Sequence, residues 1–116
     1  MAAAQEKRAR IRELNDAVRF AGPRSDEAVL WVLTRGVRAL GEDTVLSAIR
    51  AVQAFDRFTE ENDPYGEHDF GSFEIAGQTL FWKIDYYDRP LEGGTPDPTD
   101  EAVTCRVLTI LLAHEY

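Results

Sequence analysis

Residues 69–87 read DFGSFEIAGQTLFWKIDYY, and this stretch decides how the rest of the chain must fold. Large apolar residues alternate with polar residues in both halves, which is the period of a strand with one buried side. The alternation predicts two strands, over residues 69–76 and 79–87. A two-residue turn at Gly77-Gln78, with glycine first, would join them into a β-hairpin.

This turn also predicts how the two strands pair. Ile75 would face Leu80 and Phe73 would face Trp82, so that the large apolar groups of both strands lie on one side. Gly71 interrupts the alternation just before Phe73, which predicts a β-bulge at that position.

The segments outside the hairpin predict three helices and one more strand. Apolar residues three and four apart indicate helices over residues 4–20 and 42–55. The run AVLWVLT over residues 28–34 is typical of a buried strand. Asp97-Pro98 resembles a helix start, and the apolar residues after it predict a central buried helix over residues 98–114. The predicted fold class is α+β, in the order α-β-α-β-β-α, with a small, mainly antiparallel three-stranded sheet packed by helices.

The length and composition indicate one compact protein. A chain of 116 residues corresponds to a single domain over residues 1–116, of which we expect residues 1–5 to be frayed. There is one cysteine, which indicates a reducing compartment. The sequence predicts no signal peptide and no transmembrane segment, so we expect the protein to be cytoplasmic.

The charge of the chain is distributed unevenly. The formal net charge is −8, but residues 1–40 carry eight basic and five acidic residues, a net +3. Residues 41–116 carry five basic and sixteen acidic residues, a net −11. This acidic part argues against direct nucleic-acid binding, which needs a basic surface, and it favours a partner protein with a basic surface.

The basic residues that are present lie mainly in the first predicted helix. They alternate there with acidic residues at spacings that allow ion pairs one helical turn apart, such as Asp16 with Arg12. We therefore interpret this helix surface as solvated rather than as a nucleic-acid-binding surface.

Residues 62–71, NDPYGEHDFG, contain the densest group of potentially reactive side chains. The segment from Asp63 to Gly66 has the composition of a type I turn. The residues after it are Glu67, His68 and Asp69, and the hairpin would bring Asp69 near Asp85 or Tyr86. The cluster has two interpretations, which the sequence leaves open.

As a functional cluster, these four side chains would bind a divalent cation or act as acid and base in a small enzyme. As a structural cluster, the carboxylates would accept backbone N–H groups and the histidine would bridge to a carboxylate. No established metal-ligand spacing surrounds His68, so we favour the structural interpretation and predict no bound metal and no cofactor.

A second group of candidate residues lies on the outer side of the predicted hairpin. Trp82 and Tyr86 share the parity of the apolar side, whereas Phe81, Lys83 and Tyr87 point the other way. Exposed aromatic side chains must be covered by another helix or by a partner. The first explanation is favoured, and the second makes these residues a candidate binding surface.

The motifs NDPYGEHDFG (residues 62–71) and FWKIDYYD (residues 81–88), with the final segment RVLTILLAHEY, resemble a family of small bacterial proteins catalogued as a domain of unknown function. The resemblance begins near residue 11 and covers most of the chain. It implies that such proteins are often carried on plasmids, and it implies no activity.

The sequence therefore favours a non-enzymatic interaction protein that docks on a basic partner surface, and we expect an anti-defence or regulatory role on a mobile element. The alternative is a small metal-dependent or acid–base enzyme that uses the Glu67-His68-Asp69 cluster with Asp85. The predicted binding residues are Glu60, Glu61, Phe81, Lys83, Tyr87 and Glu92.

Overall fold

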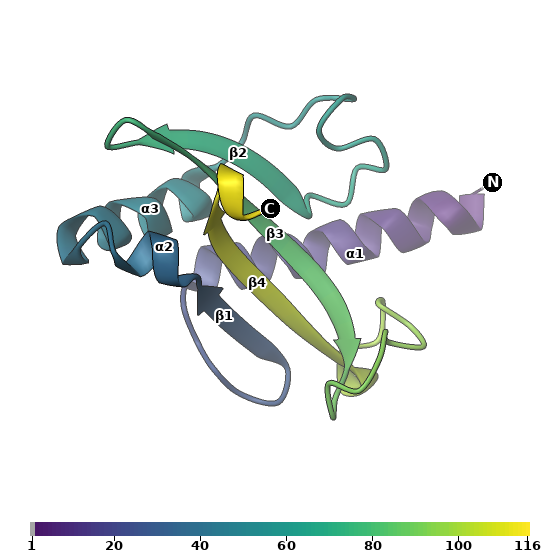
Figure 1. The fold of residues 1–116 in the computed structure, drawn as a ribbon. Coiled ribbons are helices and arrows are strands. Elements are labelled where there is room, and N and C mark those ends of the chain that lie inside the picture. The colour runs from purple at the N-terminus through teal and green to yellow at the C-terminus, as the bar shows by residue number, and fades with distance from the viewer. Residues whose placement is uncertain (1) are drawn as a thin grey trace.

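A computed structural model describes residues 2–116 and shows an α+β fold with a four-stranded sheet (Figure 1). The elements in chain order are α1 (Ala2–Ala21), β1 (Val29–Leu33), α2 (Arg35–Arg38), α3 (Glu42–Ala54), β2 (Phe70–Ile75), β3 (Gln78–Asp88), the 3₁₀ turn η1 (Glu101–Val103), β4 (Thr104–Leu112) and the 3₁₀ turn η2 (Ala113–Glu115). Of residues 1–5, which the sequence predicted to be frayed, residues 2–5 belong to α1 and residue 1 lies outside the described part.

The strand order in the sheet is β1-β4-β3-β2. The β2–β3 and β3–β4 pairs are antiparallel, and β1 pairs with β4 in parallel. The predicted three-stranded sheet is thus wrong in detail, because the sheet is mixed and has a fourth strand. The predicted strand over residues 28–34 is confirmed as β1, at an edge of the sheet.

The fourth strand, β4, replaces the helix that was predicted over residues 98–114. It lies in the interior of the sheet, between β1 and β3, and both of its faces are largely buried. A continuous apolar run is typical of a buried helix and of a central strand alike, and periodicity does not separate the two. The β-branched residues Val107, Thr109 and Ile110 favour the strand, since they pack well on a pleated surface.

The residues before β4 that predicted a helix start do form hydrogen bonds of that kind, but these stabilise only local turns. The carboxylate of Asp97 accepts a hydrogen bond from the backbone N–H of Thr99 at 3.0 Å, and Asp100 accepts one from Ala102 at 2.9 Å. The Asp100 bond is the N-cap of the single 3₁₀ turn η1, and the Asp97 bond stabilises the turn that precedes it. From Thr104 onward the chain pairs with β3 and forms the strand β4.

The hairpin of β2 and β3 is confirmed, with a pairing shifted by two residues. Ile75 pairs with Gln78 and Phe73 with Leu80, so the turn is Ala76-Gly77 instead of Gly77-Gln78. Both turn residues have positive φ, 52° and 74°, as a type I′ turn requires. A shift of two residues preserves the side of the sheet to which each side chain points.

The predicted bulge at Gly71 is absent. Gly71 pairs directly with Trp82, and the β2–β3 ladder is regular from Phe70 to Ile75. The glycine serves packing instead, because it leaves room for the indole of Trp82.

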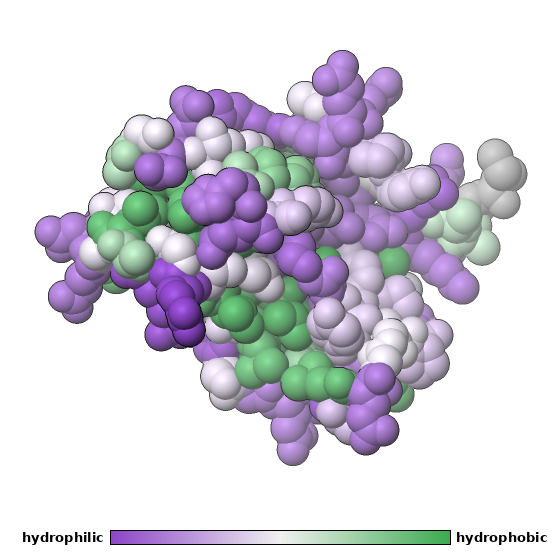
Figure 2. All heavy atoms as spheres, viewed as in Figure 1, coloured by the Kyte–Doolittle hydropathy of each residue, from purple (hydrophilic) through white to green (hydrophobic). Residues whose placement is uncertain are grey.

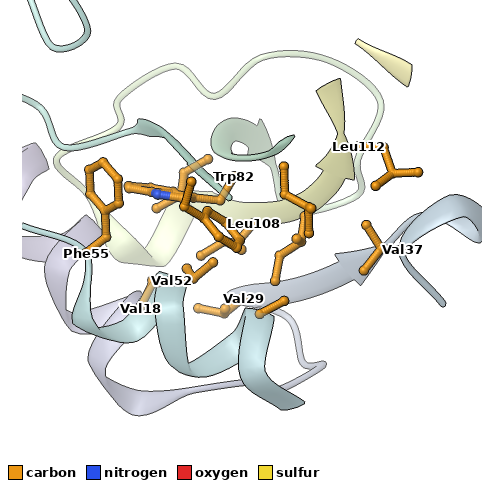
Figure 3. Packing of buried hydrophobic residues seen from close by; sticks show 13 residues of the cluster. Val18, Val29, Val37, Val52, Phe55, Trp82, Leu108 and Leu112 are labelled. Atoms are coloured by element: carbon orange, nitrogen blue, oxygen red, sulfur yellow. The ribbon is translucent and has the colours of Figure 1, made fainter. Parts of the chain in front are cut away.

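The two long helices, α1 and α3, are confirmed, and both lie on the same side of the sheet (Figure 1). Their apolar residues pack on the strands in one core, in which Trp82, Leu108 and Val52 are completely buried (Figure 3). Burial of each such side chain is worth about 1.5–3 kcal/mol relative to exposure. None of the described helices is both long enough and apolar enough to cross a membrane.

The other side of the sheet faces the viewer in Figure 1, and no α-helix of the described residues covers it. Only the short turn η2 and the C-terminal Tyr116 lie over one end of it. Figure 2 shows hydrophobic residues gathered on this side, over the region of β1 and β4. We call this surface the open sheet face.

Candidate functional site

The loop over residues 56–69 connects α3 to β2 and carries the cluster that the sequence singled out. It is ordered by its own turns: the backbone N–H of Asp63 donates to the carbonyl of Thr59 at 2.8 Å, and that of Gly66 donates to the carbonyl of Asp63 at 3.1 Å. The second bond confirms the predicted turn from Asp63 to Gly66. This turn directs the next three residues toward α1.

His68 is held by several contacts at once. Its imidazole stacks on Phe58, with ring centroids 3.7 Å apart and an interplanar angle of 5°. Its Nδ1 lies 2.9 Å from the carboxylate of Asp16, and its backbone N–H donates to Asp63 at 3.1 Å. The backbone φ of His68 is +55°, which is uncommon for a residue other than glycine, and these contacts keep it there.

The partners of the His68 ring also define where its proton lies. An ionised carboxylate only accepts hydrogen bonds, so Nδ1 carries the proton that it donates to Asp16. The other ring nitrogen, Nε2, lies 3.7 Å from a carboxylate oxygen of Asp63. His68 therefore bridges α1 and the loop, as the structural interpretation of the cluster expected.

The α1 side of this contact is a polar stripe that the sequence analysis missed. Arg12, Asn15, Asp16 and Arg19 follow each other at spacings of three, one and three residues, which places them on one helical face. Asn15 and Arg19 are fully buried, with exposures of 0% and 1%. This helix surface was interpreted as solvated, and the structure shows that part of it instead packs on the loop.

Asn15 is the centre of a buried polar network. Its side-chain amide donates to the hydroxyl of Tyr86 at 2.8 Å and to the backbone carbonyl of Glu67 at 3.0 Å. Its carbonyl oxygen accepts a bond from Nε of Arg106 at 2.8 Å. Tyr86 in turn donates to the carboxylate of Glu67 at 3.0 Å. One asparagine thus connects α1 with the loop, β3 and β4.

Arg19 connects α1 with α3. Its guanidinium donates to the carbonyls of Val52 and Phe55 at 2.8 and 3.0 Å, where α3 ends. The Val52 carbonyl also accepts the backbone N–H of Phe55 at 3.3 Å, and a cation at this end of the helix complements the helix dipole. The guanidinium lies over the ring of Trp82 at 5.1 Å and pairs with Asp16 at 3.0 Å.

Two residues of this region have strongly shifted pKa values. Burial, with the nearby charge of Glu67 second, raises the pKa of Asp69 to about 6. Burial also raises the pKa of Tyr86 well above its ordinary value, so this hydroxyl stays protonated and donates to Glu67. With its pKa raised in this way, the Asp69 carboxyl is suited to exchange a proton near neutral pH.

The structure does not bring all four cluster residues together. Glu67 reaches Tyr86, His68 reaches Asp16, and Asp85 pairs with Lys83 at 2.8 Å on the open sheet face. Within residues 2–116, no group of three His, Cys, Asp or Glu side chains has the geometry to hold a metal ion.

The open sheet face is the second candidate site. The alternation of β3 that the sequence predicted holds here: Trp82 is completely buried on the helix side, whereas Phe81 and Tyr87 point to the open side. The sequence favoured a helix as the cover for these aromatic residues. In the structure, Phe70 and Tyr116 pack on Phe81 instead, with centroid distances of 5.2 and 5.6 Å.

Much of the open sheet face stays accessible. Tyr87 is 37% exposed and Val32, on β1, is 40% exposed. The predicted acidic binding residues Glu60, Glu61 and Glu92 are exposed as well, in two separate loops, and they do not form one cluster with Phe81. Sequence periodicity predicted which β3 side chains point outward, but only the β1–β4 and β3–β4 pairings place Val32 on the same side of the sheet, across β4 from them.

A comparison with protein-family models matches residues 33–115 to the family described as a protein of unknown function (DUF3768). The chain belongs to this family. The matched range covers β2, β3, β4 and the loop with His68, whereas the polar stripe of α1 and all of β1 except Leu33 precede it. Searches of the curated proteins and of the solved structures found no match.

Proposed function

We propose that this member of the family is a non-enzymatic interaction protein that docks through its open sheet face on the basic surface of a partner protein. The observation that supports this is the placement of both long helices on one side of the sheet, which leaves apolar and aromatic side chains exposed on the other (Figures 1 and 2). Contiguous apolar surface that stays exposed on a folded protein commonly marks an interaction site.

The composition of the open sheet face suits a protein partner. Tyr87 and Phe81 on β3 supply aromatic area, Val107 lies on the adjacent strand β4, and Val32 lies on β1 at the far side of β4. Interface centres are enriched in aromatic residues and depleted in unpaired charge. Lys83 Nζ and Asp85 Oδ2 form an ion pair at 2.8 Å, so burial of the two side chains in an interface would leave no isolated charge.

The charge of the chain selects among protein partners. Residues 41–116 contain sixteen acidic and five basic residues, and Glu60, Glu61 and Glu92 are exposed in loops around the sheet. Such a distribution attracts a basic partner and repels an acidic one. A role in regulation or anti-defence on a mobile element is compatible with this chemistry and with the plasmid carriage that the family resemblance implies.

The test uses a partner identified by affinity capture and mass spectrometry and then purified. We expect Val32→Arg to weaken binding at least tenfold in calorimetry, because it places an unpaired charge in the apolar part of the face. Leu46→Arg is the matched control: Leu46 is 48% exposed on α3, on the helix side, and the same change there should leave affinity unchanged.

The basic nature of the partner is tested separately. Reversal of Glu60, Glu61 and Glu92 to lysine should slow association and weaken its dependence on salt, because exposed charges act over roughly 10 Å at 0.1 M salt. Equal affinity of Val32→Arg and the parent would refute docking through the open sheet face. A stable homodimer that Val32→Arg dissociates would replace the partner by a second copy of this chain.

The second candidate function is a small acid–base or metal-dependent enzyme. The observation in its favour is Asp69, whose pKa is raised to about 6 beside Glu67 and His68. The contacts of His68 with Asp16 and Phe58 count against it, because they occupy the ring. One equivalent of zinc or manganese in the purified protein, lost in His68→Ala, would favour the enzyme over the interaction protein.

A further inference from the structure

A cavity of about 130 Å³ lies on the helix side of the sheet, where α1 crosses the first residues of β1 and β4. We call it the Arg106 cavity. Its apolar wall consists of Leu14, Ala17 and Val18 from α1, with Ala28 and Val29 at the start of β1. No residue of the Glu67-His68-Asp69 cluster or of the open sheet face lines it, so it is independent of the proposed docking surface.

Three charged residues also line this cavity, and two of them are neutralised by neighbours. Arg24 pairs with Asp26 at 2.7 Å, and Glu101 lies 3.6 Å from Arg10. The third is Arg106. Among residues 2–116, no carboxylate lies within the 4.0 Å of an ion pair with its guanidinium.

Arg106 is 3% exposed, so its charge is almost completely removed from bulk solvent. Nε donates to Asn15, Nη2 donates to the carbonyl of Pro98, and the guanidinium lies 5.1 Å from the centre of the Tyr86 ring. Within the described residues, the remaining nitrogen, Nη1, has no hydrogen-bond acceptor. Burial accordingly lowers the pKa of Arg106.

The charges of Glu101 and Glu67 act on Arg106 from a distance without forming an ion pair with it. A buried cation that lines a cavity and has no carboxylate in direct contact is a binding group for an anion. Arginine binds carboxylates well, and a charge-assisted hydrogen bond in a site of low dielectric is stronger than one in water. We propose that the Arg106 cavity binds a small monocarboxylate with a short aliphatic tail, with the carboxylate on Arg106 and the tail on the wall formed by Leu14, Val18 and Val29.

The volume sets the size of this ligand. A cavity of about 150 Å³ in another protein holds benzene, which has six heavy atoms. A cavity of about 130 Å³ therefore suits a ligand of roughly five or six heavy atoms, such as propionate or butyrate. A longer fatty acid would not fit, and a doubly charged anion would exceed the single positive charge available.

The experiment uses butyrate as the probe, with butyramide and butylamine as neutral and cationic analogues of the same size. We expect butyrate to shift the amide signals of Ala17 and Ala28 and the Nε–H signal of Arg106 in ¹⁵N NMR titrations. The melting temperature should rise by a few degrees at about ten times the dissociation constant. Butyramide and butylamine should bind at least tenfold more weakly.

A variant that keeps the charge tests the cavity itself. Ala17 is exposed on the surface of α1 and lines the cavity, so Ala17→Leu should fill part of the space without loss of folding, and it should weaken butyrate binding at least tenfold. Ala4→Leu, at an exposed α1 position outside the cavity lining, is the matched control and should bind butyrate like the parent.

Three outcomes would overturn the proposal. The first is equal binding of butyrate by Ala17→Leu and the parent. The second is binding of butyramide as tight as that of butyrate, which would show that Arg106 does not select a charge. The third is binding of inorganic phosphate as tight as that of butyrate, which would show that the apolar wall does not select a tail.

Discussion

The indole of Trp82 occupies the space that a side chain on Gly71 would need. The two residues are direct partners in the β2–β3 ladder, and both are buried. A Cβ built on Gly71 would clash with the indole nitrogen and would lie 2.7 Å from the ring of Phe55. Since Trp82 is completely buried at the centre of the core, this missing side chain determines how closely α3 approaches the sheet.

Gly71→Ala should therefore destabilise the protein by about 2–3 kcal/mol, because a methyl group is forced into a close-packed core. The melting temperature should fall by about 10 °C. Thermal unfolding followed by near-ultraviolet circular dichroism would record both the midpoint and the environment of the Trp82 ring.

Gly93→Ala is the control for this change. Gly93 lies in the exposed loop after β3, and a Cβ there would have no neighbour within 4 Å. We expect its melting temperature to stay within about 2 °C of the parent, as for most exposed substitutions. Similar midpoints for the two variants would contradict the packing role of Gly71.

The sequence predicted the elements whose local signals and tertiary environment agree. The hairpin, the two long helices and the outward side of β3 all follow from periodicity. β4 did not, because its apolar residues cover every side, and a helix and a central strand bury such a segment equally well. Only its position between β1 and β3 decides in favour of the strand.

The polar network around Asn15 and Arg19 could not be predicted from the sequence, for a related reason. Asn15 and Arg19 are ordinary surface residues by type, and their burial depends on the loop over residues 56–69 folding back on α1. Long-range contacts of this kind leave no local period. A spacing of three, one and three residues between polar side chains was the available signal, and it equally describes a solvated helix face.

The side chain of Asp63 should contribute to stability through the backbone of His68. It is buried and accepts the N–H of His68 at 3.1 Å, so Asp63→Ala leaves that donor without a partner and should cost about 1–2 kcal/mol. Asp63→Asn keeps an acceptor oxygen and should lose less. Urea unfolding measures both, and equal stability of Asp63→Ala and the parent would show that the loop does not need this bond.

Arg19 should be among the residues least tolerant of change. Arg19→Met removes three hydrogen-bonding interactions, leaves the Phe55 carbonyl without its side-chain donor and leaves Asp16 with His68 as its remaining partner. We expect a loss of about 3 kcal/mol or more in urea unfolding. Arg50→Met, at an exposed position on α3, provides the comparison and should change stability by less than about 0.5 kcal/mol. Equal losses in the two variants would mean that the buried contacts of Arg19 add nothing.

Asp69 should make the protein less stable as the pH rises from about 4 to 6. Its pKa is about 6 in the folded protein, against an ordinary value of 3.8. Between these two values the unfolded chain has lost the proton that the folded protein still holds, so folding becomes less favourable as the pH increases. Above pH 6 both states are ionised and this loss is complete. Because Asp69 is only partly buried, solvent screening reduces the effect to about 1 kcal/mol.

Asp69→Asn keeps the shape of the side chain and removes its charge, so it should stabilise the protein by about 1 kcal/mol at pH 8 and have little effect at pH 4. Urea unfolding at a series of pH values separates this residue from the other acids, because their contributions cancel in the difference between variant and parent and only that of Asp69 remains. Glu60→Gln removes an exposed loop charge and should give a difference that is small at every pH. A difference for Asp69→Asn that does not change between pH 4 and pH 8 would mean that Asp69 titrates as an ordinary exposed acid. It would also remove the observation that favours an acid–base role for this cluster, since a carboxyl group that is ionised at its usual pH has no proton to exchange near neutrality.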